Sequence, residues 1–163
     1  AGCGGGSSAP AAPTGKEAEL VAAINKVWKE KFVAGQVDHE QLTLNQDAVD
    51  VISAYGHICE KANETPHILT KDDFAMISEG SGKFAEKMKN NSLAGMAGVP
   101  VPFSGKVMAL EDAYSCEDAA VRAFVAKLLD NSNSAKAEFI SIYLPVVQGK
   151  TYMTAVVFRN NKV

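Results

Sequence analysis

Apolar residues recur every three or four positions in separate segments of the chain, which is the spacing of an amphipathic helix. Each segment opens on Ser or Thr with an acidic or amide residue three positions later, a pair that satisfies the free N–H groups of a first helical turn. These capping boxes are Thr14 with Glu17, Thr43 with Gln46, Thr70 with Asp73, and Ser115 with Asp118. The pattern predicts about four helices that begin at these positions.

The apolar face of each predicted helix is defined by its own residues. The faces are Leu20, Ala23, Ile24, Val27 and Trp28 in the first; Ala48, Val49, Ile52, Tyr55, Ile58, Cys59 and Ala62 in the second; Phe74, Ile77, Phe84 and Met88 in the third; and Ala120, Phe124, Val125, Leu128 and Leu129 in the fourth. In the third helix, Gly80 and Gly82 are expected to weaken or break the middle, because glycine is a poor helix former.

Strand patterns follow the last helix. Phe139, Ser141 and Tyr143 alternate with Ile140, Ile142 and Leu144, and both sets are largely apolar. This predicts a central strand that is covered by helices on both sides. Pro145 ends the strand, a turn is expected at 148–150, and residues 152–158 are expected to return antiparallel.

The segment 92–105 is rich in Gly, Pro and small apolar residues. Pro100 and Pro102 exclude a helix there and favour an extended loop or an edge segment. Residues 106–110 are expected to form a short strand. Helices first and a hairpin last predict an α+β fold, a three-layer α-β-α sandwich with a mostly antiparallel sheet.

Composition limits the classes of function. The 163 residues are 47% hydrophobic, which is enough for one domain with its own core. The net charge of −3 disfavours nucleic acid and anionic lipid as partners. The sequence contains no run of roughly 18 apolar residues, so no membrane span is predicted within it. We interpret residues 1–13 as a flexible Gly/Ser/Pro leader and 14–163 as a single domain.

Three cysteines allow different interpretations. Cys3 precedes a Gly/Ser run, as in the lipid-carrying cysteine of a bacterial lipobox, although Ala1 and Gly2 still precede it; the other interpretation is a simple tethering cysteine. Cys116 at a helix start has the position of a low-pKa nucleophile. Its more economical use is a disulfide with Cys59, which would stabilise the fold by about 4 kcal/mol and would persist outside a reducing cytosol.

The residues also resemble a known superfamily. The run from Ser115 to Val121, the paired strands that end in Tyr-x-Thr-x-Val-x-Phe, and the first helix with Ile24 and Asn25 resemble the CAP superfamily of cysteine-rich secretory and PR-1-like proteins. The segment 139–145 (FISIYLP) is similar to one branch, the surface antigens of Eimeria (the SAG or TA4 type). The resemblance spans residues 16–159.

The resemblance implies a non-enzymatic, disulfide-containing surface antigen or adhesion protein with a CAP-like fold. Such a protein would be extracellular, tethered by a glycolipid (GPI) anchor added beyond Val163, and would contact host cells or host immune molecules. The alternatives are a bacterial CAP-domain lipoprotein anchored at Cys3, or a secreted CAP-type lipid-binding or metal-dependent protein.

The cleft chemistry of that superfamily is incomplete in this chain. Active-looking members use two histidines and two acidic residues, whereas the histidines here are His39, His57 and His67, and none forms a ligand pair in sequence. By the resemblance, His67 matches the first cleft histidine and Glu111 is the candidate acid. One histidine and one carboxylate make a weak metal site, so no catalytic, cofactor or metal residue is predicted.

Two connecting segments are candidates for partner contacts, and both can equally be packed connections. One is the segment 92–105, which would expose Met96, Val99 and Phe103, and the other is the connection 32–41. Asn63 and Asn90 lie in glycosylation sequons.

Overall fold

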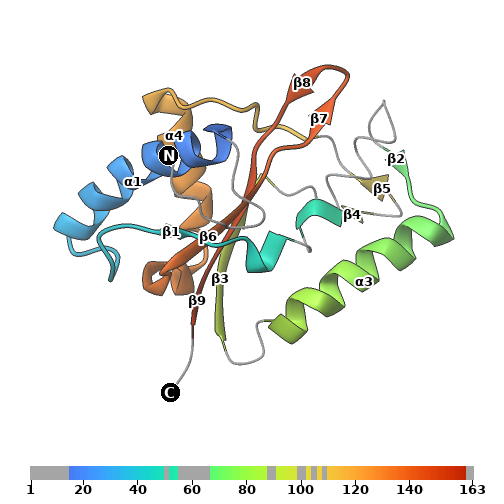
Figure 1. Cartoon of the computed structure of the whole chain (residues 1–163), viewed down its shortest axis with the longest axis horizontal. Coiled ribbons are helices and arrows are strands. Elements are labelled where there is room, and N and C mark those ends of the chain that lie inside the picture. Colours follow the sequence, from blue (N-terminus) through green and yellow to red (C-terminus); the bar gives the residue numbers. More distant parts are fainter. Residues whose placement is uncertain are drawn as a thin grey trace.

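The protein has an α+β architecture in which helices pack on a mixed sheet (Figure 1). The computed structural model describes residues 15–49, 52–54, 67–87, 91–98, 102–103, 106–107 and 110–160. Its helices are α1 (Gly15–Val33), η1 (Gln46–Ala48), α3 (Lys71–Lys87), α4 (Asp118–Leu128) and η2 (Ser132–Lys136), where η denotes a 3-10 helix.

The main sheet has the strand order β1-β6-β9-β3. Its strands are β1 (Thr43–Leu44), β6 (Phe139–Tyr143), β9 (Thr154–Asn160) and β3 (Asn91–Ala97). β1 runs parallel to β6, while β9 runs antiparallel to both of its neighbours. β6 is therefore a central strand, as its two apolar faces predicted.

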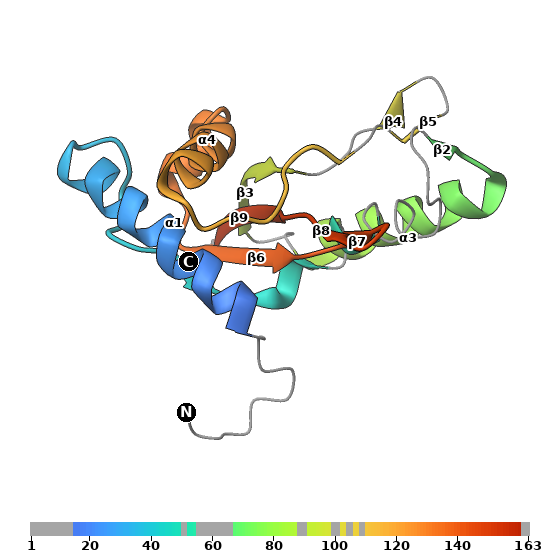
Figure 2. The same ribbon diagram turned by 90° about the horizontal axis from the view of Figure 1, so that it is seen from above.

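Two smaller sheets complete the described strands. β2 (His67–Ile68), β5 (Lys106–Val107) and β4 (Pro102–Phe103) form one, and β7 (Val146–Val147) with β8 (Lys150–Thr151) forms the other. Seen from above, α1 and α4 lie toward one end of the molecule, and α3 with β2, β4 and β5 toward the other (Figure 2).

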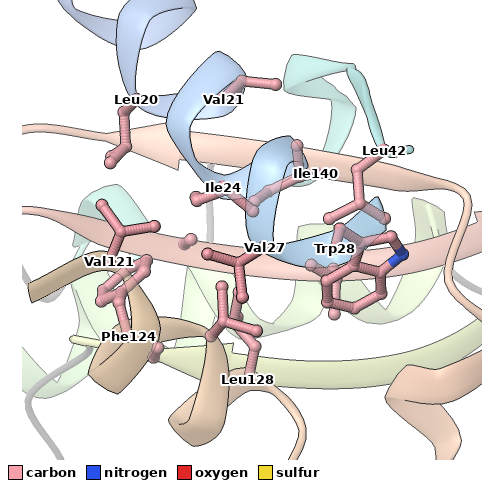
Figure 3. Close-up of a cluster of buried hydrophobic side chains, with 14 of the residues drawn as sticks. Leu20, Val21, Ile24, Val27, Trp28, Leu42, Val121, Phe124, Leu128 and Ile140 are labelled. Atoms are coloured by element: carbon pink, nitrogen blue, oxygen red, sulfur yellow. The ribbon is translucent and has the colours of Figure 1, made fainter. Parts of the chain in front are cut away.

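One face of the main sheet is covered by α1 and α4. Their buried side chains meet Ile140 of β6 (Figure 3). Ile142 of the same strand belongs to the same apolar cluster. The fully shielded members from the helices include Leu20, Ile24, Trp28, Phe124, Val125 and Leu128. The stripes predicted for α1 and α4 thus mark the core correctly.

The opposite face of the sheet carries a smaller apolar cluster. Phe139 and Tyr143 of β6 pack there against Ala48 and Ile52, together with residues of β9. The alternation along β6 therefore sends its two sets of side chains to opposite faces, as predicted.

The second predicted helix begins later than its capping box. Thr43 and Leu44 form β1, and Asn45 is the N-cap residue, its side chain accepting from the Asp47 amide. Gln46 does not reach back to a cap; its side-chain amide instead pairs with the backbone of Ile142. The prediction of a helix start at Thr43 is wrong, because pairing with β6 holds these residues extended. Residues 55–62 of that predicted helix lie outside the described part of the chain.

The other capping boxes have different outcomes. Thr70 and Asp73 form a reciprocal pair: Asp73 accepts from the Thr70 amide at 2.9 Å, and Thr70 Oγ1 accepts from the Asp73 amide at 3.2 Å. That box is confirmed. Thr14 lies outside the described residues, although α1 begins directly after it at Gly15.

The glycines of α3 do not interrupt it, contrary to expectation. The helix runs without a break through Gly80 and Gly82. A capped first turn and the packing of Ile77 in a cluster with Leu69 and Leu110 hold the helix in place. Phe74, assigned to the apolar face, is half exposed, and Asp73 is buried instead.

The glycine-rich segment 92–105 includes an edge strand. β3 pairs along β9 with a register shift between Leu93 and Gly95. The edge alternative is therefore the correct one, and the short strand expected at 106–110 is observed as β5 at Lys106–Val107. Residues 99–101, 104–105 and 108–109 lie outside the described chain.

Candidate functional site

The described residue with the most reactive chemistry, Cys116, lies on the segment that leads into α4. Backbone hydrogen bonds fix this segment against β8 and the residues that follow it: the Tyr114 amide donates to the Thr151 carbonyl at 2.9 Å, and the Met153 amide donates to the Asp112 carbonyl at 2.8 Å. Cys116 is exposed, and its thiol donates to the Tyr114 hydroxyl at 3.3 Å.

Cys116 does not lie in the first turn of the helix. α4 begins at Asp118, with Glu117 as an N-cap residue that has extended backbone angles and no capping hydrogen bond from its side chain. Ser115 Oγ accepts from the Glu117 amide at 3.1 Å, which closes a local turn before the helix. The predicted capping box at Ser115 is wrong for this reason, and Cys116 is not part of the helix N-terminus that favours a thiolate.

Tyr114 connects this segment to the start of α1. Its hydroxyl lies 3.1 Å from the Lys16 carbonyl and 3.3 Å from Glu19 Oε1, and the Lys16 ammonium lies 5.3 Å from the centre of the ring. Burial, followed by the hydrogen bond with Cys116 and the nearby Glu19 carboxylate, raises the pKa of Tyr114 above its ordinary value. The phenol therefore stays protonated, and this arrangement anchors α1 to the segment before α4.

The predicted disulfide stays a prediction. Cys59 and Cys3 lie outside the described residues, and no disulfide is present among the cysteines that the structure describes. The exposure of Cys116 leaves its sulfur accessible to a partner sulfur.

The histidines and acids nominated by the resemblance are dispersed. His39 is exposed, with Nε2 4.0 Å from Glu138 Oε2. His67 belongs to β2, opposite Val107 of β5. His57 lies outside the described chain, and Glu111 is exposed. Within the described ranges, no three His, Cys, Asp or Glu side chains gather where a metal could bind.

Asp112, next to Glu111, has a structural contact. Its two carboxylate oxygens lie 2.7 and 2.8 Å from the Lys127 ammonium of α4. This ion pair attaches the same segment to the side of α4, whereas the neighbouring Glu111 is exposed to solvent.

The two predicted contact segments differ in their surroundings. Of residues 32–41, only Val37 is buried and Lys31 before them is partly covered, while Phe32 and Val33 are 40% and 76% exposed. In the segment 92–105, the backbone through Ala97 is engaged with β9. Val99 lies outside the described residues.

A surface that the sequence marked only as a turn is the β7–β8 hairpin. Gln148 and Gly149 have φ of 54° and 80°, which identifies the two-residue turn that matches the twist of a hairpin. Val146 is 46% exposed, and the Lys150 ammonium lies 5.5 Å from the centre of the Tyr152 ring. The Gln-Gly-Lys run was the available signal for this surface.

No protein family model matches the chain, and neither a curated protein nor a solved structure is significantly similar to it. Among the described helices, none is both long and apolar enough to cross a membrane.

Proposed function

We propose that the protein is a non-enzymatic surface antigen or adhesion protein with a CAP-like sandwich fold. It is tethered outside the cell by a glycolipid anchor added beyond Val163, and it contacts host cells or host immune molecules. The proposal starts from the resemblance of the sequence of residues 16–159 to the Eimeria surface antigens.

The observation that carries the proposal is the contrast between a shielded core and exposed connections. Trp28, Phe124 and Ile140 are fully shielded, while the connection after α1 exposes Phe32 and Val33. A rigid scaffold that presents variable loops is the usual arrangement of binding proteins, because loops tolerate change that the core does not.

The polar side chains near Cys116 have structural roles, which suits this proposal. The Tyr114 hydroxyl holds the start of α1, and Asp112 binds Lys127. An antigen needs a stable scaffold more than a reactive centre, and these contacts attach the segment before α4 to both helices.

An extracellular location is supported by the position of Cys116. Its sulfur is exposed and therefore accessible to a partner sulfur, for which the sequence predicts Cys59. Such a bond persists only in an oxidising environment.

The test is performed on intact cells that produce the protein. Antibodies to the purified chain should stain cells without permeabilisation, and phosphatidylinositol-specific phospholipase C should release the protein into the medium. An intracellular stain would contradict the proposal, and so would surface protein that the phospholipase does not release. Diacylglycerol on Cys3 in native material would favour the lipoprotein alternative instead.

The second part of the test is binding. Purified full-length chain should bind host cells saturably, and unlabelled chain should compete for the same sites. Failure to bind any host cell or host immune protein would contradict the contact function, while phospholipase release would still decide the anchor.

A further inference from the structure

We propose that the protein forms a dimer in which β3 pairs antiparallel with the β3 of a second copy. The pairing joins two four-stranded main sheets into one continuous sheet across a two-fold axis. Dimerisation through β3 does not depend on the proposed function.

β3 ends the main sheet on one side. It is seven residues long, and β9 is the one described strand with which it pairs (Figure 1). α1 and α4 pack on one face of this sheet, and Ala48 and Ile52 lie on the other. These elements cover the faces of the sheet, so they leave its β3 edge available to another strand.

The opposite edge of the sheet is closed. β1 has two residues, and the Thr43 and Asn45 amides donate to backbone carbonyls of Glu138 and β6. The backbone groups of Leu42 therefore point away from β6, because successive residues of a strand alternate in direction. Asn25 of α1 binds both of them, at 2.8 Å for the amide and 3.0 Å for the carbonyl. Another strand can therefore pair at length only on the β3 side.

The backbone of an edge strand selects its partner by chemistry. It presents N–H and C=O groups that pair best with another extended backbone. The strands at the other edges of the described sheets have two residues each, so two copies offer each other one long edge, β3. A surface that contacts itself closes into a two-fold dimer and does not continue into a fibre. A second copy is therefore the partner that fits.

Charge also favours pairing of β3 with itself. Residues 91–98 contain no Lys, Arg, Asp, Glu or Pro, the residue types that commonly guard an exposed edge. Two antiparallel copies of this strand therefore bring no like charges opposite each other. The net charge of −3 comes from the rest of the chain, where it opposes association through other surfaces.

An irregularity in β3 sets the expected register. Leu93 pairs with Phe158 and Gly95 with Val157, so Ala94 is an extra residue without a counterpart on β9. A two-fold axis at Ala94 places 91–93 of one copy against 95–97 of the other, and Ala94 against itself. A bulge bends its strand, and an axis through the bulge keeps the two halves of the pair equivalent.

The oligomeric state of the full chain tests the dimer. A single strand pair buries less than the ~1,600 Å² of a standard interface, so we expect a weak dimer with a Kd of roughly 10–100 µM. Sedimentation equilibrium over a concentration series should show a monomer that converts to a dimer and to no larger species. A chain that stays monomeric at about 1 mM, well above this Kd, would overturn the inference.

Opposite charges at the axis test the strand. Ala94→Lys and Ala94→Glu should each weaken association about fivefold or more, because like charges meet at the axis. An equimolar mixture of the two variants should regain association, since Lys then faces Glu. Thr43→Lys, at an exposed position of the opposite edge, should leave the Kd of the dimer within about twofold of the parent. A Kd that Ala94→Lys leaves unchanged would overturn β3 as the interface.

A neutral variant tests the register if the charged ones fold poorly. Oxidised Ala94→Cys should give a peptide linked through position 94 of both copies, because directly opposed Cβ atoms lie about 4.5–5.5 Å apart. Thr43→Cys should give no link between two copies of position 43. A dimer without the 94–94 link would contradict the pairing. None of these measurements involves a host partner, so their failure would leave the antigen function standing.

Discussion

Two serines that are both fully shielded from solvent differ in their hydrogen bonding. Ser141 Oγ on β6 accepts from the Ala48 amide and donates to the Asn45 carbonyl. Ser134 Oγ on η2 has no hydrogen-bond partner among the residues that the structure describes. A buried hydroxyl without a partner costs free energy on folding, and a paired one does not.

Replacement of the two serines should therefore change stability in opposite directions. Ser134→Ala should raise the free energy of unfolding by about 1 kcal/mol, because the desolvated hydroxyl is removed. Ser141→Ala should lower it by about 1–2 kcal/mol, because two backbone groups lose their partner. Urea denaturation of both variants measures the difference, and destabilisation of equal size in both would contradict the assignment.

Gly98 is required by a close approach of two backbone segments. Its φ is +73°, and a Cβ at this position would overlap the Met153 carbonyl oxygen. Gly98→Ala should cost about 2 kcal/mol or more of unfolding free energy, because strain and overlap add.

Gly35 is the matched control for this substitution. Its φ is +77°, but a Cβ there would meet open space. Gly35→Ala should cost only about 1 kcal/mol, from backbone strain alone. Equal thermal shifts in the two variants would show that the contact with Met153 is unimportant.

At the scale of elements, side-chain amides extend the short strand β1. Gln46 donates to the Ile142 carbonyl and accepts from the Ile142 amide, both at 2.8 Å. Asn25 of α1 pairs with the backbone of Leu42 in the same manner, at 3.0 and 2.8 Å. These amides continue the hydrogen bonding that β1 supplies over only two residues.

Gln46→Glu tests this role, because a carboxylate cannot donate to the Ile142 carbonyl. We expect a loss of about 2 kcal/mol at neutral pH, with partial recovery at acidic pH, where a protonated Glu donates again. Gln41→Glu, at an exposed position next to Leu42, adds the same charge and should change stability little. Similar effects of the two substitutions would contradict the pairing.

α1 and α4 are also joined by a surface ion pair that depends on pH. Arg122 contacts both carboxylate oxygens of Glu30, at 2.8 and 2.9 Å, and Asp118 at 2.8 Å. The hydrogen bond from Arg122 is the main cause that lowers the pKa of Glu30 below its ordinary 4.5. A lowered pKa in the folded state stabilises above pH 4.5, and this contribution is lost as the pH falls through the folded value.

Glu30→Gln should therefore lower the urea midpoint at pH 7, and the difference from the parent should shrink as the pH falls below 4.5 and Glu30 becomes protonated. The effect is small because both groups are exposed, and it should decrease further in high salt. Glu79→Gln on α3 removes an exposed carboxylate elsewhere and is the control. A difference that persists at acidic pH would contradict the ion pair as the cause.

At the scale of the whole molecule, the predicted Cys59–Cys116 disulfide remains open to test. Non-reducing peptide mapping of native protein should find the two cysteines in one linked fragment. Cys116→Ser should then lower the unfolding temperature in oxidising buffer and have little effect after reduction. Two free thiols in native material would contradict both the bond and the extracellular proposal that depends on it.

The local patterns of the chain determined much of this fold. The stripes that contain Ile24, Trp28 and Phe124, the alternation along β6 and the turn at Gln148 all appear where they were predicted. Each depends on interactions within a few residues, or on the single requirement that apolar side chains leave water. Such local requirements can be inferred from the sequence alone.

Tertiary structure decided what local patterns left open. Thr43 has the residues of a helix start and forms a strand, because β6, nearly a hundred positions away, offers a parallel ladder. Ser115 does not cap a helix, because backbone bonds to Thr151 of β8 and to Met153 hold the residues before it extended. The candidate site follows the same rule. The contact of Cys116 with Tyr114 was within reach of local inference, but the position of the β7–β8 hairpin at the other end of the strands from Asn160 depends on the direction of β9 beside β6.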